Sequence, residues 1–182
     1  QDFYEDSAER MVGDIDFLVS ADQYQNTIEV LLSDKYESVS KSGYNFPIFK
    51  HYPRLIKKDE IAAVEIHKEM LVEKYSDEFD HHTIKNDIIH SKGFYFLGFN
   101  HQKALSIFSS QINDKGYVYK SINLKSAYDV LLLSKKSSDI NFITQFNKLQ
   151  KPINCFLITS HYLFGKIDSI NFNQSKYAKN YL

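Results

Sequence analysis

The stretch GDIDFLV, residues 13–19, is the starting point for the fold, because carboxylates alternate with apolar residues before a short apolar end. This alternation is typical of a β-strand. Side chains two residues apart on a strand project to the same face, so Asp14 and Asp16 point together while Ile15 points away. Two neighbouring carboxylates repel each other unless a cation lies between them. The stretch therefore predicts a strand that carries a cation site, although a bare D-x-D also occurs at surface turns.

Further elements follow outward from this strand. Ser20 and Gln23 have the spacing of a capping box, and apolar residues then recur at helical spacing, which predicts a helix over 21–33. Three strand candidates come next, at about 36–41, about 46–57 and 61–68. The pattern predicts a small sheet with at least one helix packed on it.

The last of these strands supplies a third carboxylate. Residues 61–68 are apolar except where Glu65 and His67 interrupt the run. A carboxylate inside an otherwise buried strand is costly unless it is paired or holds a metal. Mg²⁺ prefers oxygen ligands, and a third carboxylate would allow two metal ions about 3.5–4 Å apart. Glu65 is therefore the natural partner for Asp14 and Asp16.

The second half of the chain has a helical pattern. Apolar spacing predicts a helix over 124–132, a second one capped by Asp139, and a third that Pro152 opens and Gly165 closes. We expect an α+β protein, with a small mixed sheet flanked by helices and followed by a C-terminal helical region. The predicted division is a core over 1–95, helices over 96–170 and a loose tail over 171–182.

Composition excludes several classes of protein. The 182 residues carry 22 Lys and Arg against 23 Asp and Glu, a formal charge of −1, and 43% are hydrophobic. These values exclude wholesale disorder and argue against general nucleic-acid or membrane-surface binding. Cys155 is the only cysteine, which excludes an intrachain disulfide and a multi-cysteine zinc site. No apolar run reaches the ~18 residues of a membrane span and no signal peptide is recognisable, so we expect a cytoplasmic protein.

Several of these segments resemble a known family. RMVGDIDFLV, residues 10–19, resembles the R-x-x-G-D-h-D-h-L-V segment of the polymerase-β-like nucleotidyltransferase superfamily, in its branch of uncharacterised bacterial nucleotidyltransferases. VEIH, residues 64–67, is similar to that branch's E-h-H strand, and HYP, residues 51–53, to its preceding H-x-P strand. SAYDVLL, residues 126–132, resembles the helix that the branch carries downstream.

The resemblance implies a function and a set of site residues. Asp14 and Asp16 would be metal ligands, and Glu65 the third carboxylate, placed to help activate an acceptor hydroxyl. The cofactor would be Mg²⁺, two ions in number, and the substrate a nucleoside triphosphate such as ATP. The acceptor, whether protein, RNA or small molecule, is not specified by the sequence, and neither is the oligomeric state.

Three further residues are candidates for nucleotide binding. Gly13 belongs to the matched segment. Arg10 lies four residues before Asp14 and is a candidate contact for the triphosphate, with a surface ion pair to nearby acids as the alternative. His67 shares a face with Glu65 and is a candidate to bind phosphate or orient the metal ligands, with a purely structural histidine as the alternative. By contrast, adjacent His81 and His82 predict a solvated loop.

One departure from the family pattern keeps other functions open. Members carry a Gly-Gly, Gly-Ser or Lys-Gly signature before the D-x-D strand, where it cradles the triphosphate, and residues 1–9 contain no glycine. Either further chain precedes Gln1 or the phosphate-binding element has been lost. The alternatives are a catalytically inactive binding protein of the same fold, such as a toxin–antitoxin or regulatory partner, and a phosphodiesterase or other metallohydrolase that uses the same carboxylates.

Overall fold

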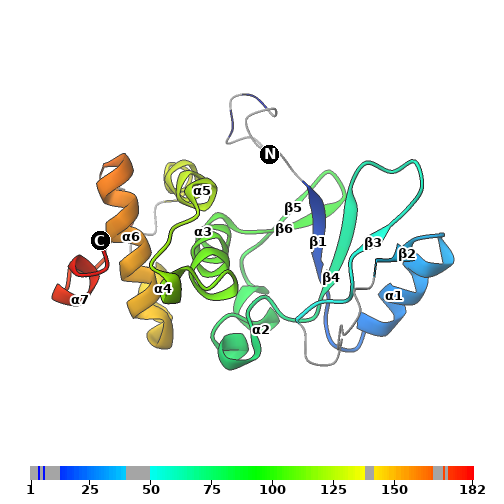
Figure 1. Ribbon diagram of the computed structural model, residues 1–182. Helices are drawn as coiled ribbons and strands as arrows, with labels where there is room; N and C mark the ends of the chain where they lie inside the picture. The colour runs from blue at the N-terminus through cyan, green and yellow to red at the C-terminus, as the bar shows by residue number, and fades with distance from the viewer. Residues whose placement is uncertain are drawn as a thin grey trace. The chain divides into compact units, whose positions relative to one another are not determined.

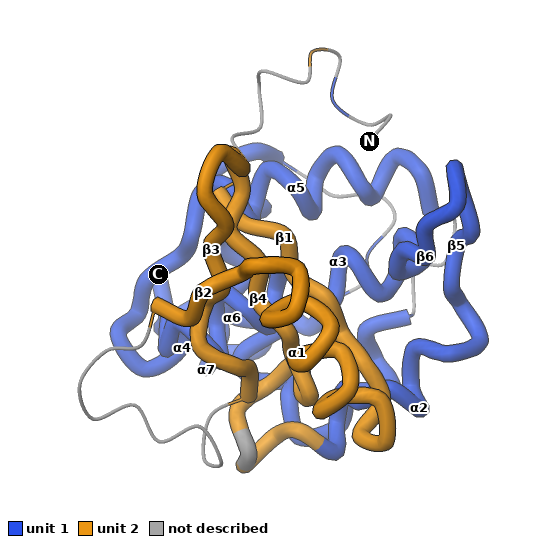
Figure 2. Tube along the Cα trace, turned by 90° about the vertical axis from the view of Figure 1, so that its right-hand side faces the viewer, with its two compact units in different colours: residues 1–4, 77–182 blue, residues 5–76 orange. Residues whose placement is uncertain are grey.

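The protein forms two compact units in a computed structural model that describes residues 4, 6, 13–39, 50–137, 142–165, 170 and 172–182 (Figure 2). Unit 2 comprises residues 5–76, and unit 1 comprises residues 1–4 and 77–182. The described elements are mixed α and β with a helical C-terminal region, which confirms the predicted fold class (Figure 1). The predicted contact residue Arg10 lies outside the described residues, as does the segment 40–49.

Unit 2 contains a mixed sheet in the strand order β1-β4-β3-β2. The strands are β1 (Asp14–Leu18), β2 (Glu37–Ser38), β3 (Leu55–Ile56) and β4 (Ala63–His67). β1 runs parallel to β4, whereas β3 is antiparallel to both β4 and β2. The first and last of the predicted strands are therefore direct neighbours. Within the described residues, β2 and β3 cover only parts of the predicted strands at about 36–41 and 46–57, and residues 40–49 lie outside that part of the chain.

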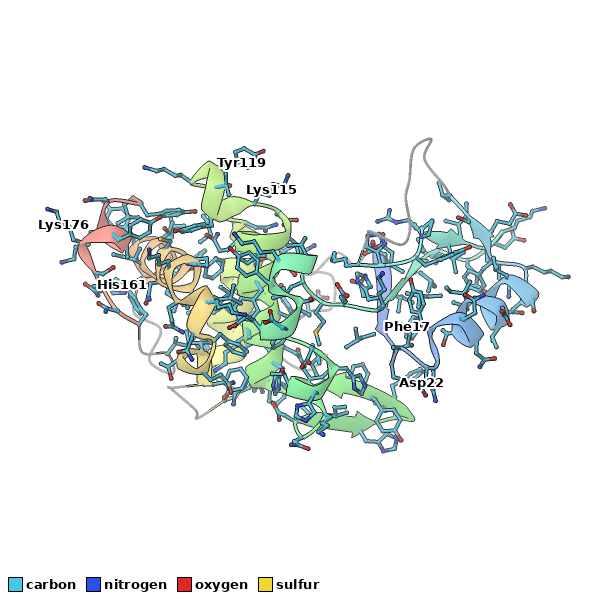
Figure 3. The ribbon with its side chains drawn as sticks, turned by 90° about the horizontal axis from the view of Figure 1, so that it is seen from below. Phe17, Asp22, Lys115, Tyr119, His161 and Lys176 are labelled. Atoms are coloured by element: carbon cyan, nitrogen blue, oxygen red, sulfur yellow. The ribbon has the colours of Figure 1, made fainter. Side chains whose placement is uncertain are left out.

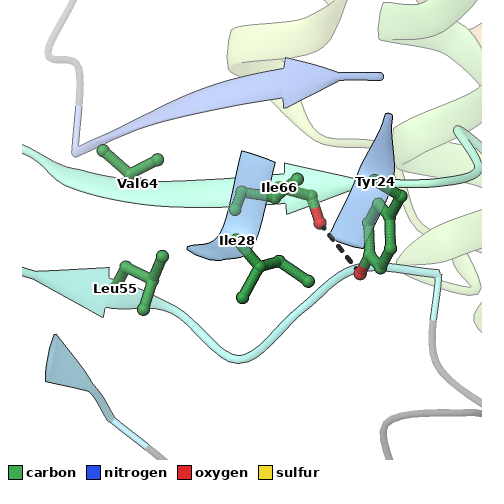
Figure 4. Close-up of a cluster of buried hydrophobic side chains, with 5 residues drawn as sticks. All are labelled: Tyr24, Ile28, Leu55, Val64 and Ile66. Atoms are coloured by element: carbon green, nitrogen blue, oxygen red, sulfur yellow. Dashed lines mark hydrogen bonds between the residues drawn. The ribbon is translucent and has the colours of Figure 1, made fainter. Parts of the chain in front are cut away.

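One face of this sheet is covered by α1 (Tyr24–Ser33). Tyr24 and Ile28 from the helix pack with Leu55, Val64 and Ile66 from the strands (Figure 4). Each of these five side chains is at most 8% exposed, and the Tyr24 hydroxyl donates a 3.5 Å hydrogen bond to the Ile66 carbonyl. Because strand side chains alternate, burying Val64 and Ile66 on this face places Glu65 and His67 on the other.

The start of α1 differs from the predicted capping box. Gln23 itself is the residue before the first helical turn, and its side chain makes no capping hydrogen bond. Its backbone N–H instead donates to the Ser20 carbonyl, so residues 20–23 form a turn. The helix therefore begins at Tyr24, later than the capping-box spacing suggests. Packing of the apolar face, and not a side-chain cap, is what supports this helix.

The boundary between the units falls within a 3-10 segment, η3 (Glu73–Glu78), and α2 (His81–Ile84) and the hairpin of β5 (Ile88–Ser91) and β6 (Phe94–Leu97) follow in unit 1. The positive φ angles of Lys92 and Gly93 fit the tight turn that joins the two strands. His81 and His82 do not lie in a loop. They open α2, where the Asp80 carboxylate caps the helix by accepting from the Thr83 N–H.

The rest of unit 1 is helical. Its α-helices are α3 (Phe99–Phe108), α4 (Gly116–Tyr119), α5 (Leu124–Ser134), α6 (Gln150–Phe164) and α7 (Lys176–Lys179), with shorter turns η4 (Ser109–Asn113), η5 (Phe142–Gln145) and η6 (Asn147–Leu149). Phe79, Phe108 and Phe146 form an edge-to-face cluster with ring centroids 5.0–5.6 Å apart in its core. Among the described residues, none of the helices combines the length and the apolar character that a membrane span needs.

Two of the three predicted C-terminal helices are confirmed, and the segment between them differs from the prediction. The predicted helices at 124–132 and 152–165 are α5 and α6, and Gly165 with a φ of +83° follows α6 as expected. Asp139 lies outside the described residues, and 142–149 form the two 3-10 segments in place of one helix.

The C-terminal residues also differ from a loose tail. They include α7 and bury Tyr181, whose hydroxyl lies 2.8 Å from the Gly116 carbonyl oxygen, 3.1 Å from Gln111 Oε1 and 3.2 Å from the Ser121 carbonyl oxygen. The sequence pattern did not indicate this contact, because the residues around Tyr181 are mostly polar.

Candidate functional site

The parallel pairing of β1 and β4 brings the predicted carboxylates together. In the strand register Asp16 lies beside Glu65, Asp14 beside Ala63 and Leu18 beside His67. Asp14 and Asp16 are two residues apart on one strand, and Glu65 and His67 two apart on the next, so the four share one face of the sheet. Phe17, labelled in Figure 3, follows Asp16 and belongs to the opposite face. The two-residue spacing on each strand and the pairing of β1 with β4 therefore place acids that are far apart in the sequence on one face of the sheet.

Asp16, Glu65 and His67 form the tightest part of this site. Each offers one ligand atom, and these atoms all lie within 4.8 Å of one another. His67 Nε2 donates a 2.9 Å hydrogen bond to Asp16 Oδ1 and lies 3.6 Å from Glu65 Oε2. Glu65 and His67 are largely buried, whereas 63% of the Asp16 side-chain surface is exposed. The group is thus open to solvent on the side of Asp16.

The electrostatics of this group keep Asp16 ionised. The hydrogen bond from His67 lowers the pKa of the Asp16 carboxyl below its usual value, against a smaller opposing effect of desolvation. An ionised carboxylate with several free lone pairs is what a hard divalent cation needs as a ligand. Asp16 is therefore in the right state for metal binding at neutral pH.

Asp14 is held by a residue that the sequence reasoning did not single out. Arg54 Nη2 donates a 2.6 Å hydrogen bond to Asp14 Oδ2, and Arg54 Nε donates a 3.0 Å hydrogen bond to Glu65 Oε1. The guanidinium thus bridges two of the three predicted carboxylates. The pair with Glu65 raises the pKa of Arg54 further above its already high value, so this residue is cationic at every accessible pH.

Strand pairing could have revealed Arg54. Leu55 lies beside Val64 in the antiparallel register of β3 and β4, so the preceding residue Arg54 comes next to Glu65. The only sequence signal was the position of Arg54 directly after the HYP segment. Periodicity within one strand does not say which residues of another strand face it, so this neighbour needed the register.

His51 is a second neighbour of the group. It forms an isolated antiparallel bridge with His67, one residue out of step with the β3–β4 register, which marks a bulge. The two imidazole rings lie 5.0 Å apart, and His51 Nδ1 is 2.8 Å from the Tyr52 carbonyl oxygen and 3.9 Å from Glu65 Oε2. The bulge places His51 on the same face of the sheet as the carboxylates.

Gly13 lies immediately before β1. A Cβ atom built on it would meet no described atom within 4 Å, so the structure gives no steric reason for glycine there. Gly13 remains a predicted nucleotide contact on the strength of the motif alone.

A mixed α and β fold with carboxylates on adjacent strands fits the class that the sequence motifs predict, and a comparison with protein families identifies that class. A family model described as uncharacterised nucleotidyltransferase matches residues 1–164. The chain belongs to this family, which confirms the relationship that the sequence motifs predict. Neither the curated proteins nor the solved structures include a significant match to the chain.

Proposed function

We propose that this protein is a metal-dependent nucleotidyltransferase that moves a nucleotide from a nucleoside triphosphate to an acceptor hydroxyl. One observation carries the proposal: Asp14, Asp16 and Glu65 share one face of two adjacent strands, with Asp16 directly beside Glu65. Membership of the family supports the general activity. The metal, the nucleotide and the class of acceptor are the finer parts of this proposal, and the experiments below test them.

The residues at this site fit a hard divalent cation. Three carboxylates supply oxygen ligands, and Asp16, Glu65 and His67 already place one ligand atom each within 4.8 Å of the others. We propose Asp14, Asp16 and Glu65 as the residues that hold Mg²⁺, with two ions as the expected number. Bound Mg²⁺ would neutralise phosphate charge and make the α-phosphorus more electrophilic.

The chain's own residues then have distinct roles in the proposed reaction. The acceptor oxygen forms a bond to the α-phosphorus, the bond from that phosphorus to the bridging oxygen of the β-phosphate breaks, and pyrophosphate leaves. Glu65 is the carboxylate we propose to assist removal of the acceptor proton, because it is largely buried. His67 holds the Asp16 carboxylate in place through its 2.9 Å hydrogen bond, and so orients a metal ligand.

Calorimetry tests the binding part of this proposal. Titration of the wild-type protein with ATP, GTP, CTP or UTP in Mg²⁺ should show metal-dependent binding of at least one nucleotide, and the Asp14→Asn/Asp16→Asn double variant should lose it. The matched control is Asp34→Asn, which removes a carboxylate of the same unit that is exposed and paired with Lys57. Equal binding by the wild type and the double variant would refute the proposal.

The acceptor needs a separate assay. Incubation with α-³²P-labelled nucleotide and either bulk RNA, protein extract or a small-molecule hydroxyl panel should transfer label to one class with release of pyrophosphate. Metal-dependent nucleotide binding without transfer to any class would favour the catalytically inactive binding protein. Water-dependent release of product without an acceptor would favour a metallohydrolase.

A further inference from the structure

The guanidinium of Arg54 pairs with one oxygen atom on each of two carboxylates that we propose as metal ligands. It reaches two carboxylates through different nitrogen atoms, Asp14 Oδ2 through Nη2 at 2.6 Å and Glu65 Oε1 through Nε at 3.0 Å. The second oxygen of Glu65 faces His67 at 3.6 Å. Glu65 therefore lies between the permanent positive charge of Arg54 on one side and the Asp16–His67 pair on the other.

This arrangement separates Asp14 from the other carboxylates. Among the described residues, the group with ligand atoms within 4.8 Å of one another consists of Asp16, Glu65 and His67, and Asp14 is not part of it. The Asp14 carboxylate interacts with Arg54 instead. A lone pair that accepts a hydrogen bond from a guanidinium cannot coordinate a cation at the same time. A cation bound by Asp14 and Glu65 would thus compete with Arg54 for these two carboxylates and be repelled by its charge.

Arg54 is built so that its side chain can move while its backbone stays. Half of its side-chain surface is exposed, which leaves the guanidinium room in solvent to change rotamer. Its backbone is fixed by the fully buried neighbour Leu55 and by the Arg54 carbonyl, which accepts a 2.8 Å hydrogen bond from the Val39 N–H. A planar guanidinium binds phosphate oxygens in the same two-pronged way as it binds carboxylates.

We propose that Arg54 competes with the divalent cation for Asp14 and Glu65, and that it transfers to a phosphate group of the nucleotide when metal and nucleotide bind together. The inference rests on the proposed function and extends it. Free metal weakens the two ion pairs of the guanidinium without giving it a new contact. The metal–nucleotide complex provides that contact, so Arg54 makes the site favour the complex over the bare ion.

The test compares two ligands on the same variants by calorimetry, with Mn²⁺ alone and with the Mg²⁺ complex of the nucleotide that the wild type binds. Arg54→Met should bind Mn²⁺ about three- to tenfold more tightly, the range expected when two partly exposed ion pairs no longer compete. It should bind the metal–nucleotide complex about tenfold more weakly, because a charge-assisted phosphate contact is lost. A purely structural role would weaken both.

Two controls sharpen the result. Lys57→Met removes a positive charge three positions further along the chain, where it pairs with Asp34 outside the site, and should change neither affinity by more than about twofold. Arg54→Lys keeps the charge without the two-pronged geometry. It should therefore weaken nucleotide binding, and it should tighten Mn²⁺ binding by a smaller factor than Arg54→Met does. Circular dichroism establishes that each variant is folded, and Arg54→Lys alone decides the question if Arg54→Met is not.

The outcomes separate this inference from the proposed function. If the wild type binds no metal–nucleotide complex, or Asp14→Asn/Asp16→Asn binds it equally well, both fail. If the wild type binds as proposed but the Arg54 variants leave Mn²⁺ affinity unchanged or lower it, the competition is refuted and the function stands. Tighter binding of both ligands would likewise overturn the phosphate role of Arg54.

Discussion

Tyr181 should contribute measurably to the stability of unit 1 through its hydroxyl group. The side chain is 8% exposed, and its hydroxyl lies within 3.2 Å of three acceptor oxygens, on Gly116, Ser121 and Gln111. Burial raises the pKa of this hydroxyl to about 12, so it remains a donor throughout the neutral range. Tyr181→Phe removes that donor while the ring continues to fill its place.

The expected loss follows from what the three acceptors keep. The Gly116 carbonyl still accepts from the Ser121 N–H at 2.9 Å, and the Ser121 carbonyl still accepts from Gln111 Nε2 at 3.1 Å. Two of the three oxygens therefore retain a partner, and Gln111 Oε1 is the one most affected. We expect Tyr181→Phe to lower the free energy of unfolding by about 1–2 kcal/mol, the cost of one buried hydrogen bond without a large desolvation penalty.

Urea denaturation followed by circular dichroism measures this change. The matched control is Tyr177→Phe, because Tyr177 is 48% exposed and its hydroxyl forms an exposed hydrogen bond with the hydroxyl of Tyr117. That variant should stay within about 0.5 kcal/mol of the wild type. If Tyr181→Phe is no more destabilising than Tyr177→Phe, the C-terminal residues do not anchor unit 1 in the way described.

Three further predictions concern buried groups and close contacts. Burial raises the pKa of Cys155 to about 11, so its thiol should react with a disulfide reagent at pH 8 only after denaturation. Rapid labelling of the native protein would contradict the burial of this residue. Folding raises the pKa of Cys155 from 9.0 and of Tyr181 from 10.0, so both groups favour the folded state below those values and lose that contribution as the pH rises. The free energy of unfolding should fall by roughly 3 kcal/mol between pH 9 and pH 11, with about 2 kcal/mol of this from Cys155. A smaller decline in Cys155→Ala, measured by urea titrations at both pH values, checks the cause. Gly116→Ala should lower the free energy of unfolding by about 1–3 kcal/mol in the same assay, because its Cβ would lie 2.5 and 2.8 Å from the backbone carbonyl oxygens of Ser110 and Ser121. In the control variant Gly13→Ala the new Cβ would meet no described atom within 4 Å, so its effect should be close to neutral. Equal effects of the two variants would refute the steric argument.

Periodicity predicted the faces of strands and helices well, because a side chain's direction follows from its position along the element. Asp14 and Asp16, and Glu65 and His67, share a face as their two-residue spacing requires. The roles of Asp14, Asp16 and Glu65 as metal ligands, and of His67 as a residue that binds phosphate or orients those ligands, remain predictions. Arg54 could not be found in the same way, because its importance comes from the register between β3 and β4, and the intervening chain sets that register.

Local signals for the ends of elements were less reliable than periodicity. Ser20 and Gln23 have the spacing of a capping box, yet Gln23 itself precedes the first helical turn and α1 begins at Tyr24. A capping box contributes about 1 kcal/mol, which the packing of Tyr24 and Ile28 on the sheet outweighs. His81 and His82 likewise lie on a short helix because Asp80, before them, caps it.

The pairing of β1 with β4 also has a consequence for how the protein folds. His67 and Asp16 are 51 residues apart in the chain, and a parallel ladder between such segments forms only after the connection between them has closed into a loop. In a partly folded chain Glu65 lies away from Asp14 and Asp16, so the three carboxylates do not yet share one site. Metal affinity at this site should therefore appear late in refolding, so a bound divalent ion would report completion of the sheet and would slow its unfolding.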